Sequence, residues 1–157
     1  MQFVAPNMNE QSLEAFYLYK FAEQGSRFPA YTPIVAGGEH ACILHYVEND
    51  QTLNDGDLVL VDAGGEYEFY ASDITRTYPV NGKFSDEQLA VYKVVLEAHK
   101  QAIEAVKTGN HIMQPQEISE RVITEGLVDL GILDGKTEDL LEEGAHKNFY
   151  MHKVGHW

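Results

Sequence analysis

The feature that most limits the fold of this chain is a pair of β-rich runs near its middle. The first run spans residues 58–63 and ends at the glycine pair 64–65, and the second spans residues 66–80. Branched and aromatic residues favour strands, and a glycine pair favours a turn. The two runs are therefore predicted to form a hairpin or a closely paired antiparallel ladder, which the Asn-Gly pair 81–82 closes with a second turn signal.

Two acidic residues, Asp62 and Asp73, interrupt these β-rich runs. Asp62 ends an otherwise apolar strand, where an ionised carboxylate is costly unless it is paired or bound to a cation. A hairpin folded at the glycine pair would point both carboxylates to one face, where they repel each other unless positive charge intervenes. Two divalent ions would supply that charge, and one carboxylate can bridge them. The alternative is that an Asp near a hairpin only hydrogen-bonds the backbone, and the spacing alone does not decide between the two.

Apolar side chains at helical spacing predict helices on both sides of the β-rich runs. The clearest start is a capping box, in which Ser85 is followed three residues later by Gln88. Pro115 is suited to the first turn of another helix, and glycines provide the stops. The expected helices lie between residues 9 and 24, 85 and 109, 115 and 131, and 137 and 143.

Short strands are expected at residues 31–36, 41–46 and 149–151. Cys42 lies in the second of these and is interpreted as a buried hydrophobe. It is the only cysteine, which excludes an internal disulfide and fits a reducing compartment. Together the elements predict an α+β fold, an antiparallel sheet covered by helices on one face.

Three histidines lie near predicted strand ends and add to the case for a metal site. His45 ends the strand at 41–46, and His152 and His156 follow the strand at 149–151. One neutral imidazole suits a metal ion, and the others could move protons or bind a substrate carbonyl. A lone histidine is more often structural or solvated, but three of them beside two strand carboxylates favour a site. The remaining histidines are predicted to be surface residues: His40, His99, His111 and His146.

Composition limits the classes of partner. Hydrophobic residues make up 44% of the 157 residues, which is enough for a substantial core. Twenty-five acidic against 11 basic residues give a net charge of −14, which repels phosphate backbones and argues against nucleic-acid binding. No apolar run approaches the roughly 18 residues that span a bilayer, and the start lacks the features of a signal peptide. A cytoplasmic protein without a membrane anchor is expected.

The motifs, taken in order, resemble the proline-specific metallopeptidases of the pita-bread fold. The segments that carry the resemblance are 42–46, 61–67, 70–77, 81–85 and 149–157, whose final His-Trp pair looks more like aminopeptidase P than prolidase. The resemblance implies a partial pita-bread (creatinase/aminopeptidase) fold. Residues 1–157 would form an incomplete catalytic domain, the first half plus the beginning of the second. The family's N-terminal domain and the C-terminal segment with its last metal ligands would be absent.

The resemblance also implies a ligand set. In the family, Asp, Asp, His, Glu and Glu bind two divalent ions in chain order, and Mn²⁺ is the metal expected here. Carried over, Asp62 would bind one ion, Asp73 would bridge both and His156 would bind the other, so that this chain holds three of five ligands. His45 and His152 would correspond to the catalytic histidines that contact the substrate or stabilise its reacting carbonyl.

The activity implied is hydrolysis of an N-terminal Xaa-Pro bond by metal-activated hydroxide, on peptides with proline in the second position. The full-length protein is expected to be a homo-oligomer, and this chain alone is expected to be inactive. Two alternatives stay open: prolidase, which cuts only dipeptides, and a non-catalytic pita-bread module that binds peptides. The three retained ligands argue against the binding module and against metal-free, creatinase-like C–N hydrolysis.

Overall fold

The computed structural model of this chain describes residues 3–156, which divide into two compact units on either side of the bond between Phe84 and Ser85. The first unit contains helix α1 (Glu10–Glu23), the short 3-10 helix η1 (Gly38–Cys42) and the strands. The second contains α2 (Asp86–Glu104), α3 (Gln114–Asp129), α4 (Thr137–Glu143) and the 3-10 helix η2 (Ala145–Asn148). The strands are β1 (Phe28–Pro29), β2 (Ile34–Gly37), β3 (Leu58–Asp62), β4 (Gly65–Tyr67), β5 (Tyr70–Ala71) and β6 (Thr75–Pro79).

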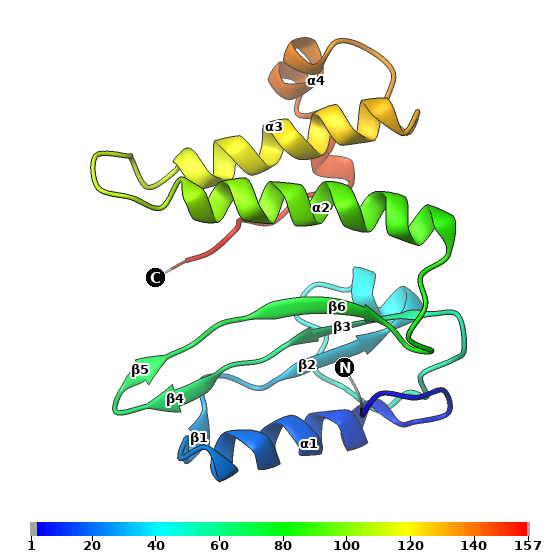
Figure 1. Cartoon of the computed structure of the whole chain (residues 1–157), viewed down its shortest axis with the longest axis vertical. Helices are drawn as coiled ribbons and strands as arrows, with labels where there is room; N and C mark the ends of the chain where they lie inside the picture. Colours follow the sequence, from blue (N-terminus) through cyan, green and yellow to red (C-terminus); the bar gives the residue numbers. More distant parts are fainter. Residues whose placement is uncertain (1–2, 157) are drawn as a thin grey trace. The chain divides into compact units, whose positions relative to one another are not determined.

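The strands form two antiparallel sheets, ordered β2-β3-β6 and β1-β4-β5. Figure 1 shows that β3 and β4 form one arm of a long hairpin, and β5 and β6 the other. The two ladders keep one register along both arms, from Leu58 opposite Pro79 to Tyr67 opposite Tyr70. The α+β class and the antiparallel pairing expected from the sequence are confirmed.

Helix α1 covers one face of the sheet β2-β3-β6 (Figure 1). Successive side chains of a strand point to opposite faces, so Val59 and Val61 of β3 pack with Leu13 of α1 and Val35 of β2. Leu60, between them, packs on the other face. Asp62 follows at the same period and therefore belongs to the face that α1 does not cover.

The hairpin turns at Glu68-Phe69 and not at the glycine pair, so that expectation was wrong. Glu68 and Phe69 both have positive φ, 49° and 70°, which is typical of the type I′ turns that join two-residue hairpins. Gly64 serves another purpose, because a Cβ there would lie 1.7 Å from the carbonyl oxygen of Ser72. Glycine is needed at this position for the close approach of two backbones.

The strand expected at 41–46 is not formed, so that prediction was wrong. The strand expected at 31–36 is present as β2, but at residues 34–37. Residues 38–42 form η1, and His45 in the turn that follows has a φ of 57°. Cys42 is exposed, contrary to the expectation of a buried thiol. The segment is held by side chains instead of a ladder: the Tyr46 hydroxyl donates to Glu10 (2.8 Å), and the Tyr46 ring stacks on His40 at 4.9 Å.

The second unit begins with the predicted capping box. Ser85 Oγ accepts from Gln88 N (3.2 Å), and Ser85 N donates to Gln88 Oε1 (2.9 Å). This helix, α2, ends at Glu104, before the stop predicted at residue 109. Pro115 lies in the first turn of α3, and α4 has the expected bounds. Helices α2 and α3 lie side by side (Figure 1), and a Cβ on Gly126 of α3 would come within 2.3 Å of Val94.

Two further expectations for the second unit need correction. No strand is assigned at 149–151, where the chain leaves η2 and continues without regular structure to residue 156. His146, predicted to be a surface residue, is buried in η2, with its Nε2 3.9 Å from a carboxylate oxygen of Glu120. His40 in the first unit was also predicted to be a surface residue but is half-buried. His99 and His111 are exposed as expected. Trp157 lies outside the described residues. None of the helices between residues 3 and 156 is both long and apolar enough to cross a bilayer.

Candidate metal centre

Asp62 and Asp73 meet at the hydroxyl group of Tyr31. The Tyr31 Oη lies within hydrogen-bond distance of Oδ1 of Asp62 and is 3.1 Å from Oδ1 of Asp73. A hydroxyl has one proton to donate, so it serves one of the two carboxylates at a time. The convergence of the two carboxylates, predicted from the sequence, is therefore present within the first unit.

The hairpin register explains why these carboxylates come together. Asp62, the last residue of β3, pairs with Thr75 in β6 and with Ile34 in β2. Asp73 lies two residues before Thr75, and residues two apart in a strand share a face. Asp62 and Asp73 are thus diagonal neighbours across the hairpin, a separation that side chains can bridge. Tyr31, three residues before Ile34, reaches the same face from the β2 side.

The surroundings of Tyr31 hold it as a neutral donor. Burial raises the pKa of the Tyr31 hydroxyl above its usual value, and the hydrogen bond to Asp62 and the charges of Asp62 and Asp73 raise it further. At neutral pH this phenol is protonated. Two carboxylates this close repel each other, and a cation between them would reduce that repulsion.

The donor set suits a hard divalent ion. Carboxylate oxygens are the ligands that Mn²⁺, Mg²⁺ and Ca²⁺ prefer. Within residues 3–156, no group of three or more His, Cys, Asp or Glu side chains is arranged as a metal site. His156 is exposed and belongs to the second unit, so its part in a shared site with Asp62 and Asp73 stays a prediction.

The two histidines predicted to act on the substrate are both exposed. His45 lies in the turn after η1 in the first unit. His152 lies after η2 in the second unit. Its ring is nearly perpendicular to the Tyr150 ring, with the ring centroids 4.9 Å apart, and its Nδ1 is 3.1 Å from the Lys153 carbonyl oxygen. Their exposure leaves the imidazoles accessible to a ligand, and their catalytic roles stay predictions.

Sequence reasoning missed Tyr31, because a tyrosine at the start of a predicted strand carries no sign of a distant partner. The only available signal was its place before a strand that could pair with the run containing Asp62. Two other missed residues are Glu10 and Gln116, both buried polar side chains that hold the segments carrying His45 and His152. Nothing in the local sequence distinguishes them from solvated helix residues.

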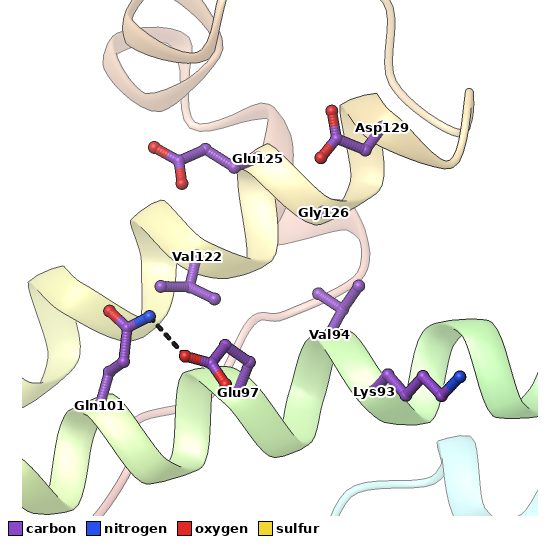
Figure 2. A pocket seen from close by; sticks show the side chains of 8 residues that line it. All are labelled: Lys93, Val94, Glu97, Gln101, Val122, Glu125, Gly126 and Asp129. Carbon is purple, nitrogen blue, oxygen red and sulfur yellow. Dashed lines mark hydrogen bonds between the residues drawn. The ribbon is translucent and has the colours of Figure 1, made fainter.

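An open groove between α2 and α3 offers a second candidate site in the second unit (Figure 2). In it, Gln101 donates a hydrogen bond of 2.8 Å to Glu97 of the same helix. None of the five predicted site residues belongs to its lining, which therefore adds nothing to the metal site. The lining residues are Lys93, Val94, Glu97, Gln101, Val122, Glu125, Gly126 and Asp129.

Comparison with known proteins identifies the family of this chain. The profile of metallopeptidase family M24 matches residues 1–157. The chain belongs to this family. Curated relatives of the M24 chain include the Xaa-Pro aminopeptidases of Haemophilus influenzae, 55% identical over 157 residues, and Escherichia coli, 45% identical over 157 residues. Each match covers the whole of this chain and 36% of the relative, so the chain spans about a third of the length of these proteins.

Solved structures confirm the fold of the M24 chain. The structure of Pseudomonas aeruginosa aminopeptidase PepP matches with a TM-score of 0.97 and 51% identity, over 99% of this chain and 35% of that protein. Zinc-substituted E. coli aminopeptidase P in complex with product matches with a TM-score of 0.95 and 44% identity, over 99% and 36%. The partial pita-bread fold expected from the sequence motifs is therefore confirmed.

Proposed function

We propose that this M24 chain is part of a Xaa-Pro aminopeptidase and supplies Asp62, Asp73 and His156 to a site for two divalent metal ions. The observation that carries the proposal is the convergence of both aspartates on the Tyr31 hydroxyl. The names of its relatives and the zinc-substituted aminopeptidase P bound to product support both the peptide substrate and the divalent metal. Residues 1–157 would be an incomplete catalytic domain of a cytoplasmic enzyme, and Mn²⁺ is the metal we expect.

The chain's own residues have distinct tasks in this proposal. Asp62 and Asp73 would hold the cations, and the neutral Tyr31 hydroxyl would orient whichever of the two carboxylates it donates to, as hydrogen-bond partners of metal ligands commonly do. Bound divalent ions would supply Lewis acidity for the scissile carbonyl and for the attacking water. His45 and His152 would donate hydrogen bonds to the substrate carbonyl or transfer a proton. Proline in the second position forms a tertiary amide with a fixed φ, which requires a pocket shaped for it.

Replacing a proposed ligand tests the assignment. In the full-length protein that contains this chain, Asp73→Asn is expected to lower kcat/KM for a Xaa-Pro tripeptide by about 100-fold or more. The estimate is a lower bound, because loss of a residue that merely supports a ligand already costs 10- to 100-fold. Bound manganese, measured by elemental analysis, should fall in parallel. The control is Asp134→Asn, which alters an exposed carboxylate in the loop before α4. Full activity in Asp73→Asn, or none in the wild type, would refute the proposal.

The 157-residue chain alone provides a second test. With three of the five expected ligands it should bind Mn²⁺ weakly, as a single ion, and release no product from Xaa-Pro peptides. Isothermal titration with Mn²⁺ and a peptide assay measure the two properties. Cleavage by this chain would contradict the need for further ligands. Absence of any metal binding, together with peptide binding, would favour the non-catalytic module, and a full-length protein that cuts dipeptides but not tripeptides would favour prolidase.

A further inference from the structure

The side chain of Gln116 is bonded to the segment that carries His152. Gln116 lies in the first turn of α3 and is 8% exposed. Its Oε1 accepts a hydrogen bond from Val154 N at 2.8 Å, and its Nε2 donates to the His152 carbonyl oxygen at 3.4 Å. One amide group therefore holds the backbone on both sides of Lys153.

This pattern reproduces what a neighbouring strand would do. A strand is held by a partner that donates to its carbonyl groups and accepts from its amides. Residues 151–155 form no strand in the structure, so no neighbouring strand holds them. The Gln116 amide provides one donor and one acceptor in its place, at the residues next to the predicted catalytic histidine.

Other contacts hold Gln116 and the start of the segment. Glu120, one turn further along α3, accepts from Gln116 Nε2 at 3.0 Å. A carboxylate accepts only, so it directs the amide nitrogen toward itself and the amide oxygen toward Val154. Tyr150 is buried against Ala98, Ile123 and Leu127, and its hydroxyl lies 3.4 Å from Gln116 Oε1. The segment is thus anchored at Tyr150 and again at Val154, with His152 midway between these anchors.

We infer that Gln116 is a positioning residue for His152 in the reaction proposed above, an inference that rests on that proposed function. Residues 151–154 are exposed and have no regular structure, so their backbone would be more mobile without the bonds to Gln116. Loss of the bonds would displace the His152 imidazole without changing its chemistry. A displacement of about 1 Å from productive geometry can cost on the order of 100-fold in rate.

The test is Gln116→Met in the full-length protein, assayed at saturating Mn²⁺. Methionine has a similar size and shape but provides neither the amide donor nor the strong acceptor. We expect kcat for a Xaa-Pro tripeptide to fall by about 10- to 100-fold, with KM changed by less than about threefold. In a His152→Ala background the same substitution should lower kcat by no more than about twofold, because two residues that act as a unit are not additive.

The control is Gln114→Met, which changes the same residue type two positions earlier in α3 and touches none of the bonds to residues 150–154. It should leave kcat unchanged. If Gln116→Met does not fold, Gln116→Leu replaces it, since leucine also lacks the amide donor and acceptor. The same fall in kcat is then expected.

Amide hydrogen exchange at Val154 provides a readout independent of activity and should accelerate at least about tenfold in Gln116→Met. Unchanged exchange, an unchanged kcat, or an equal fall in kcat in the His152→Ala background would each overturn the inference while leaving the proposed function intact. Failure of the proposed function is recognised separately, by a wild-type protein with no Xaa-Pro hydrolysis, and the inference would fail with it.

Discussion

Gly64→Ala is expected to destabilise the first unit by about 3 kcal/mol or more, at the upper end of what overpacking usually costs. A Cβ at Gly64 would lie 1.7 Å from the carbonyl oxygen and 2.5 Å from the carbonyl carbon of Ser72. These are backbone atoms, so no side-chain rotation relieves the clash. The two arms of the hairpin must separate, which weakens the bonds that Ser72 makes to Gly65 through its backbone N (3.1 Å) and its hydroxyl (2.9 Å).

The same substitution should disturb the candidate metal centre. The continuous register of the hairpin places Gly64 opposite Asp73, the residue that follows Ser72. Separation of the arms would move the Asp73 carboxylate away from Tyr31 and Asp62. Weaker binding of Mn²⁺ to the folded Gly64→Ala chain is therefore expected, in a titration made well below its unfolding temperature.

Native-state hydrogen exchange of the β3 amides in increasing urea measures the loss of stability, because it reports the first unit separately from the second. The control is Gly82→Ala in the same unit, where a Cβ would meet no atom within 4 Å and only the positive φ of 80° opposes alanine. That change should cost about 1–2 kcal/mol. A Gly64→Ala chain as stable as Gly82→Ala would show that the arms can move apart at little cost.

Glu10→Leu is expected to destabilise the first unit by about 4 kcal/mol, because buried donors left without an acceptor cost about 1–3 kcal/mol each. The Glu10 carboxylate is completely buried at the start of α1. It accepts hydrogen bonds from Gly37 N (2.8 Å), the Tyr46 hydroxyl (2.8 Å) and Gln51 N (3.0 Å). Leucine has a similar volume but accepts no hydrogen bond, so all three donors would lose their partner.

The loss of stability in Glu10→Leu should be local as well as global. The donors Gly37 and Gln51 lie at the two ends of the segment that carries His45, and Tyr46 lies within it. Burial, followed by the hydrogen bond to Glu10, raises the pKa of Tyr46 to about 12, so Tyr46 is a neutral donor at physiological pH. In Glu10→Leu, exchange of the Gly37 and Gln51 amides should accelerate before that of the β3 amides as urea is added. Glu10→Gln should cost less, since its amide oxygen can still accept from two of the three donors.

Glu14→Leu is the matched control, one turn further along α1. Glu14 accepts a hydrogen bond from Asn49 Nδ2 at 3.0 Å and is only partly buried. Its replacement should cost about 1 kcal/mol, the usual value of a single hydrogen bond. Equal effects of Glu10→Leu and Glu14→Leu on unfolding would mean that the buried carboxylate carries no special share of the stability.

That Asp62 and Asp73 share a face was predictable even though the turn was placed wrongly, whereas their close approach depends on the observed turn, which pairs Asp62 with Thr75. In a two-residue hairpin, moving the turn by whole residue pairs preserves which residues share a face. Asp62 and Asp73 therefore share a face for a turn at 64–65 and for the observed turn at 68–69. The misplaced turn had a physical cause, because glycine permits close backbone approach as well as turns, and the sequence does not say which is used.

The sequence by itself determined what depends on near neighbours: the helix starts, such as the capping box at Ser85, the strand periodicity that buries Val59 and Val61, and the shared face of the two aspartates. Only the tertiary structure decided the residues whose partners are distant along the chain. Tyr31 meets Asp73 across 42 residues, Glu10 meets Tyr46 across 36, and Gln116 meets Val154 across 38. A buried polar side chain satisfies whichever donor or acceptor the fold brings to it, and that choice has no local sequence pattern.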